Sequence, residues 1–143
     1  MTFAHPLIGL ILGKELGYTT AFVVGSVFPD IDHIFVLLKN KHFKPKEMFE
    51  AMKYEKKYGE IYKTPYTHSI IAWIIFSSFI LLIDENIGLA FCIGYAIHLL
   101  LDAINTDDKQ YFYTLKKTFK GFLPVFSWVE IIVGVVLVAL YLI

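Results

Sequence analysis

Residues 87–105 read IGLAFCIGYAIHLLLDAIN, an apolar run that carries one imidazole and one carboxylate. His98 and Asp102 are four residues apart, a spacing that places both side chains on one face of a helix. Asn105 extends the same face. A charged side chain at the centre of a membrane helix costs roughly 2.5 to 3.5 kcal/mol, so a compensating partner is expected. A divalent metal ion bound by His98 and Asp102 would be such a partner.

The composition indicates that this run lies in a membrane. Hydrophobic residues make up 57% of the 143 residues. Residues 66–83, 87–104 and 122–143 each approach the roughly 20 apolar residues that cross a hydrocarbon layer. The length suits one domain over residues 1–143. We therefore predict an all-α fold, a polytopic membrane helical bundle with three transmembrane helices. A soluble protein with a very apolar helical core is the alternative.

The lysines indicate how the bundle is oriented. All 13 basic residues are lysines, of which eight lie in residues 39–63 and four in residues 109–120, whereas the turn at residues 84–86 has none. By the positive-inside rule, both Lys-rich segments are predicted to be cytoplasmic in a multi-pass membrane protein. Because arginine is absent, an anionic substrate would have to bind through metal and ammonium groups.

The N-terminal part predicts two short helices, residues 3–16 and 20–28, with Thr19 or Thr20 as the N-cap of the second. At about 1.5 Å per residue, neither crosses a layer about 30 Å thick. We predict a re-entrant hairpin that enters from the cytoplasmic side, since a single helix over residues 3–28 would place two charges near mid-membrane. No positively charged region precedes the first apolar run, so a cleaved signal peptide is not expected. Small residues recur every four positions and would allow close helix contact: Gly9, Gly13, Gly17, Ala21 and Gly25.

A dense group of polar residues follows, Pro29-Asp30-Ile31-Asp32-His33. Pro29 is predicted to end the second helix, because proline disfavours helical geometry in the residue before it. In extended geometry Asp30 and Asp32 would point the same way. Alternatively, Asp32 caps a short helix of residues 33–38. The segment predicts either ligands for a metal or a simple turn with a cap.

The segment at residues 39–65 is predicted to be a cytoplasmic loop with an interfacial helix at residues 45–58. Met48, Phe49 and Met52 lie on one side of that helix, and a solvated helix is the alternative. His42 is predicted to be a surface residue.

Thr67-His68-Ser69 opens the next predicted span, and Pro124 opens the last one, where Glu130 is the only charge. Between the last two spans, residues 110–120 are predicted to rest at the interface. Their aromatic anchor would be Tyr111, Phe112 and Tyr113. Cys92 is the only cysteine and is predicted to be a packing residue.

The predicted topology brings the ionisable residues to one depth, near the cytoplasmic side of the bundle. An imidazole and carboxylate mixture suits zinc, with manganese or iron as alternatives. The predicted metal ligands are His5, Asp30, Asp32, His33, His68, His98 and Asp102. The predicted surrounding partners are Ser69, Asn105 and Glu130. Each of these residues alone could instead make a structural hydrogen bond.

Four features, in this order, carry a resemblance: an early His, Pro-Asp-Ile-Asp-His, Thr-His-Ser at the start of a span, and His-x-x-x-Asp in the next helix. Together they resemble the YdjM-type family of inner-membrane proteins, described as predicted membrane-bound metal-dependent hydrolases. The resemblance covers nearly the whole chain and implies that the predicted ligands are metal or catalytic positions. The family is often compared with zinc-dependent phospholipases C, which implies phosphodiester or lipid head-group hydrolysis. This sequence departs from the family where Lys63-Thr64-Pro65 replaces a His-Arg pair.

The predicted function is metal-dependent hydrolysis of an amphiphilic substrate from the cytoplasmic leaflet, with Asp30 or Asp32 accepting the proton of the attacking water. The expected partners are membrane lipid and a lipid-like substrate, with no nucleic acid. A non-catalytic membrane protein that binds or carries divalent metal is the alternative. A purely structural zinc site is a third interpretation.

Overall fold

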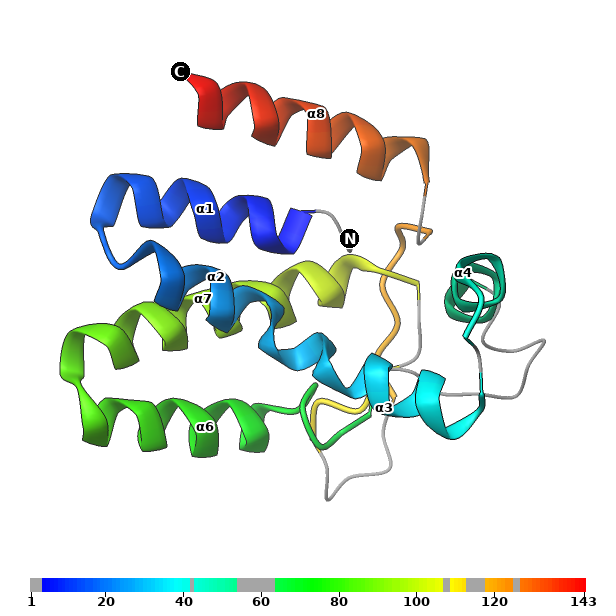
Figure 1. Ribbon diagram of the computed structural model, residues 1–143, viewed down its shortest axis with the longest axis horizontal. Helices are drawn as coiled ribbons and strands as arrows, with labels where there is room; N and C mark the ends of the chain where they lie inside the picture. Colours follow the sequence, from blue (N-terminus) through cyan, green and yellow to red (C-terminus); the bar gives the residue numbers. More distant parts are fainter. Residues whose placement is uncertain (1–3, 42, 54–63, 107–108, 113–117, 125–126) are drawn as a thin grey trace.

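The computed structural model describes residues 4–41, 43–53, 64–106, 109–112, 118–124 and 127–143 (Figure 1). These residues form helices and two isolated β-bridges but no strand, which confirms the all-α prediction. The helices are α1 (Ala4–Leu16), α2 (Thr19–Val27), η1 (Phe28–Asp30), α3 (Ile31–Lys39), α4 (Pro45–Lys53), α6 (Ile70–Ile83), α7 (Glu85–Ile104) and α8 (Trp128–Leu142).

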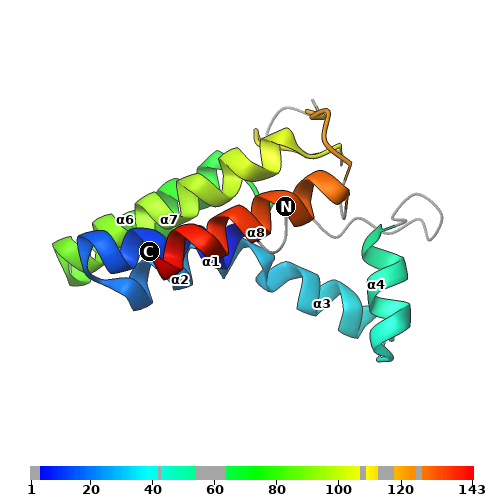
Figure 2. The same cartoon turned by 90° about the horizontal axis from the view of Figure 1, so that it is seen from above.

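Helices α1, α2, α6, α7 and α8 run side by side, whereas α3 and α4 lie beyond one end of this bundle (Figures 1 and 2). The α1–α2 and α6–α7 turns lie together at the opposite end. Gly17 in the first of these turns has a φ of 79°, and Tyr18 has a φ of 57°. Tyr18 is therefore the N-cap of α2, and the predicted Thr19 or Thr20 cap is wrong.

The centre of the bundle is a close crossing of α2 and α7. A Cβ atom added to Gly25 would lie 2.3 Å from the carbonyl oxygen of Phe91, and one added to Gly94 would lie 2.5 Å from that of Phe22. Gly9 and Gly13 bring α1 equally close to α2. The prediction that small residues permit close contact is confirmed at Gly9, Gly13 and Gly25. Gly17 has open space around it and serves the turn instead.

Helix α2 ends at Val27, just before Phe28 and Pro29 as predicted, but the chain does not leave helical geometry there. Pro29 lies in the first turn of η1, and the chain continues directly into α3. The extended geometry considered for Asp30 and Asp32 is therefore wrong. The alternative short helix is present, but it begins at Ile31 and its N-cap is Asp30, so the predicted cap at Asp32 is wrong.

Two helical runs are long and apolar enough to cross a membrane, judged by length and composition: Thr19–Lys39 with a mean hydropathy of 1.7 and Glu85–Ile104 with 2.0. The second matches the predicted span at residues 87–104. The predicted spans at 66–83 and 122–143 yield shorter apolar helices of 14 and 15 residues. Each starts late because a serine caps it: Ser69 accepts the N–H of Ala72, and Ser127 that of Glu130.

The described residues between α7 and α8 fold back on the end of α7. The N–H groups of Phe122 and Leu123 donate to the carbonyl of Ile104 at 2.9 Å. Tyr111 turns inward: its hydroxyl donates to the carbonyl of Leu99 at 3.0 Å, and its own carbonyl accepts the N–H of Ile70. The anchor prediction is therefore wrong for Tyr111. Phe112 is exposed, and Tyr113 lies outside the described residues.

The predicted surface helix at residues 45–58 is present as α4 up to Lys53, and its remainder lies outside the described residues, as does His42. Met48 of α4 packs against the buried Leu37 of α3. This contact joins the two helices beyond the end of the bundle.

Candidate metal centre

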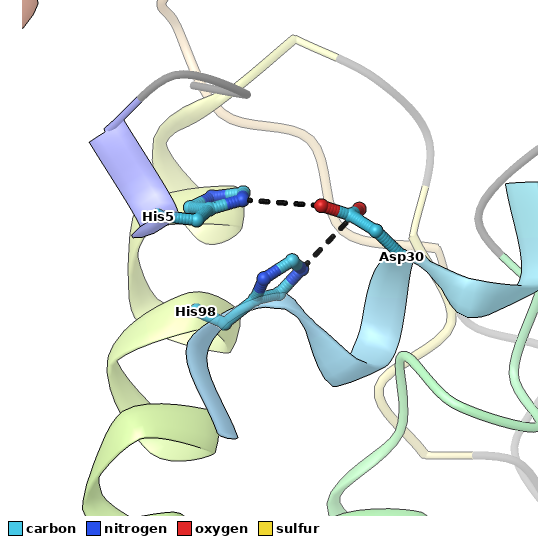
Figure 3. A group of neighbouring side chains, drawn as sticks. All are labelled: His5, Asp30 and His98. Atoms are coloured by element: carbon cyan, nitrogen blue, oxygen red, sulfur yellow. Dashed lines mark ion pairs between the residues drawn. The ribbon is translucent and has the colours of Figure 1, made fainter. Parts of the chain in front are cut away.

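The polar residues singled out in the sequence come from five separate segments. His5 lies in the first turn of α1, Asp30 in η1, and Asp32 and His33 in the first turn of α3. His68 immediately precedes the N-cap of α6, and His98 and Asp102 lie one turn apart near the end of α7. The structure brings all seven together at the end of the bundle from which α3 extends. Figure 3 shows three of them, His5, Asp30 and His98, facing one another from α1, η1 and α7.

Nε2 of His68 and Nε2 of His98 lie between two carboxylates, Asp30 and Asp102. The two nitrogens are 3.3 Å apart. Each nitrogen is 3.7 Å from Oδ1 of Asp30 and 3.5 Å from Oδ2 of Asp102. Ligands about 2.0 to 2.2 Å from a tetrahedrally coordinated zinc ion lie roughly 3.3 to 3.6 Å from one another. The separations among His68, His98 and Asp102 therefore suit one divalent ion, with the Asp30 oxygen close to both nitrogens.

The second nitrogen of each imidazole is already engaged. Nδ1 of His98 is 2.7 Å from the carbonyl oxygen of Ser26, which can only accept a hydrogen bond. Nδ1 of His68 is 3.1 Å from Oδ2 of Asp32. When each Nδ1 carries a proton, both Nε2 atoms have a lone pair that can bind a metal ion.

Asp32 holds His68 in place. Besides the imidazole, its Oδ2 accepts the N–H of Thr64 at 2.7 Å. A carboxylate that orients a ligating histidine in this way is a recurrent feature of protein metal sites. Thr64 belongs to the Lys63-Thr64-Pro65 stretch, so this stretch reaches the cluster through its backbone; Lys63 lies outside the described residues.

The other two histidines flank Asp30. His5 is 2% exposed, and neither of its ring nitrogens makes a hydrogen bond within the described residues. Its Nδ1 is 3.5 Å from Oδ2 of Asp30, and its Nε2 is 3.6 Å from Oδ1 of Asp102. His33 approaches from the other side, with Nδ1 3.5 Å from Oδ1 of Asp30. Three overlapping sets of three donors could hold an ion: His5, Asp30 and His98; Asp30, His33 and His68; and His68, His98 and Asp102.

The three residues expected around the ligands differ in their contacts. Asn105 is fully buried, and its Nδ2 lies 3.4 Å from Oδ1 of Asp102. The hydroxyl of Ser69 is used as the cap of α6. Glu130 is 2% exposed in the first turn of α8 and belongs to none of the three donor sets.

Sequence reasoning missed several groups that support the cluster. The carbonyl of Ser26 and the N–H of Thr64 are backbone groups, which no motif could reveal. Tyr95 donates its hydroxyl to the carbonyl of Thr67, directly before His68. Lys109 is 1% exposed, and its Nζ donates to the carbonyl of Asn105 at 2.7 Å. Tyr95 lies one turn before His98, so a search for polar tips along that helix face could have found it.

The comparisons with known proteins agree with the motif order. A family model described as YdjM inner membrane protein matches residues 2–143. No curated protein and no solved structure matches the chain.

Proposed function

The chain belongs to the YdjM inner membrane protein family, and from this premise we propose that it is a membrane-bound, metal-dependent hydrolase of amphiphilic phosphodiesters. The observation that carries the proposal is the pair of Nε2 atoms of His68 and His98, which are 3.3 Å apart and each 3.5 to 3.7 Å from one oxygen of Asp30 and one of Asp102. Zinc fits this donor set best, and manganese or iron are the alternatives.

A bound divalent ion would supply Lewis acidity, lowering the pKa of a water molecule and polarising the phosphoryl oxygen. The residues of the chain do the rest. Asp32 and the Ser26 carbonyl fix the rings of His68 and His98, so that both Nε2 atoms face the space between Asp30 and Asp102. The Asp30 side chain is 22% exposed, the most open of the cluster's carboxylates. We assign to its Oδ2, which faces His5, the acceptance of the water proton. Asp32 then positions His68 and does not act as the base.

We propose that α6, α7 and α8 cross the membrane with the cluster on the cytoplasmic side. The lysine distribution supports this sidedness. Helices α1 and α2 form the hairpin that enters from the same side, and its tip lies at the same end as the α6–α7 turn (Figures 1 and 2). Membrane lipid surrounds the bundle, and the substrate reaches Asp30 from the inner leaflet.

A structural metal site is the second candidate, because four donors can complete the coordination of zinc and leave no position for water. The nitrogens of His5 and His33 lie close to Asp30 as further possible ligands, which favours a site with more than four donors over a closed four-ligand structural site. The two functions differ in what metal removal does. A hydrolase keeps its helices and loses activity, whereas a structural site loses its fold.

The test is metal analysis and phosphodiesterase assay of the detergent-purified protein, with methyl 4-nitrophenyl phosphate as the substrate. We expect bound metal and metal-dependent release of nitrophenolate. The His68→Ala variant should lose metal affinity by at least about tenfold, since changes around the ligands alone cost roughly 10–100-fold. His42→Ala, at a histidine that the sequence predicts to be a surface residue, is the matched control. Wild-type protein that holds metal but hydrolyses no phosphodiester would contradict the proposal.

A further inference from the structure

An apolar groove lies between α2, α6 and α7. It has a volume of about 540 Å³, and its lining includes Ala21, Val24, Phe28, Phe76, Ile80 and Phe91. This volume falls within the range of roughly 300–1,000 Å³ that is typical of small-molecule sites.

One end of the groove lies close to the metal cluster along the chain. The helical run from Thr19, which lines the groove at the tip of the hairpin, to Phe28 of η1 has ten residues and covers about 15 Å. At its far end, the ring of Phe28 packs on those of Phe76 and Phe91, with centroid distances of 4.8 and 5.5 Å. A linear apolar molecule in the groove would have one end at Phe28, two residues along the chain from Asp30, the most open carboxylate of the cluster.

We propose that this groove binds the acyl or alkyl chain of the substrate, with the chain directed away from the cluster and the phosphodiester at Asp30. The proposal rests on the proposed function and specifies its substrate class: a phosphodiester that carries at least one long chain. The direction follows from the membrane orientation, since a lipid of the inner leaflet has its phosphate at the depth of the cluster and its chains toward the bilayer centre. Bulk lipid is as apolar as the groove, so the bound chain contributes mainly by orienting the phosphate.

The reaction used for the test is hydrolysis of a nitrophenyl phosphodiester. Water adds its oxygen to phosphorus, the bond from phosphorus to the nitrophenyl oxygen breaks, and nitrophenolate leaves while the water proton passes to Asp30. Dodecyl 4-nitrophenyl phosphate and methyl 4-nitrophenyl phosphate share this chemistry and differ only in the chain. Both are assayed with the full-length protein in nanodiscs.

Ala21→Trp fills the groove, and Val135→Trp, on the exposed face of α8, is the matched control. We expect Ala21→Trp to lower kcat/KM for the dodecyl ester by about tenfold relative to kcat/KM for the methyl ester, equivalent to about 1.4 kcal/mol. Val135→Trp should change neither ester. Equal effects on the two esters, or equal effects of the two variants, would overturn the proposal. Val24→Trp repeats the test if Ala21→Trp does not fold.

A second measurement does not depend on hydrolysis. A dodecyl phosphonate with a photoreactive diazirine at the chain end is crosslinked to the protein, and the labelled peptides are identified by mass spectrometry. We expect labels between Tyr18 and Val24 that disappear in Ala21→Trp. Labels at Phe28 would contradict the proposed direction of the chain. Labels spread evenly over α8, or crosslinks between two copies of the protein, would contradict the proposed occupant of the groove. If neither ester is hydrolysed but these labels appear, the hydrolase proposal fails while the groove assignment stands.

Discussion

Helices α7 and α8 are both apolar, but they have opposite surroundings. Helix α7 has eight buried residues, among them Gly94, Tyr95, His98 and Asp102, whereas the buried residue recorded for α8 is Glu130. A Cβ atom at Gly94 would meet the backbone of α2, whereas one at Gly134 would meet nothing within 4 Å. Apolar content therefore does not distinguish a central helix from a peripheral one. The presence of small and polar residues on one face of the helix does distinguish them.

The largest expected difference between the two helices concerns the metal. His98→Ala removes one of the two Nε2 donors, so we expect the bound metal to fall to less than about a tenth of the wild-type content. Glu130→Gln keeps the shape of the buried side chain of α8 and should retain the metal. Elemental analysis of the purified variants measures both. Loss of metal in Glu130→Gln would show that α8 contributes to the metal centre, and the proposed difference between α7 and α8 would then be wrong.

The two glycines give the next difference. Gly94→Ala would push α7 away from the backbone of α2, and we expect a loss of about 2 kcal/mol in the free energy of unfolding. Gly134→Ala meets no atom, and the better helix propensity of alanine should stabilise α8 by up to about 1 kcal/mol. Thermal unfolding in one detergent compares the two variants. Equal destabilisation would mean that α8 packs against a surface that the described residues do not provide.

The smallest difference concerns two tyrosines. Tyr95→Phe removes the hydroxyl that donates to the Thr67 carbonyl, so we expect a loss of about 1 kcal/mol in stability and a weaker hold on His68. Tyr141→Phe, at the end of α8, keeps the ring over which Nζ of Lys14 lies and should change stability by less than about 0.5 kcal/mol. Unfolding midpoints of both variants, each with and without metal, separate the stability effect from the effect on the site.

Much of the fold followed from the sequence because periodicity and apolar runs are local signals. The helices near residues 4–16 and 19–27 and the run at 87–104 lie close to their predicted bounds. The errors arose where tertiary contacts override local preference. Pro29 fits the first turn of η1, so the chain continues as a helix, and Tyr111 satisfies the Leu99 carbonyl instead of facing the interface.

The convergence of the predicted ligands could be predicted from topology, since alternating helices return His68 and His98 to one end of the bundle. The separate roles of these residues could not be predicted from the sequence. Only the distances distinguish Asp30, whose Oδ1 faces both Nε2 atoms, from Asp32, whose Oδ2 faces Nδ1 of His68 and the Thr64 N–H. The Ser26 carbonyl that fixes His98 belongs to the backbone, and every residue has such a group.

In the proposed orientation, in which α6 crosses the membrane, its short length has a consequence for the surrounding bilayer. Fourteen residues of helix extend about 21 Å, roughly 9 Å less than a hydrocarbon layer about 30 Å thick. Lipids beside α6 would have to thin locally to match it. Such a dimple would draw head groups down toward His68 at the start of that helix, so that substrate would approach the donors without leaving the leaflet.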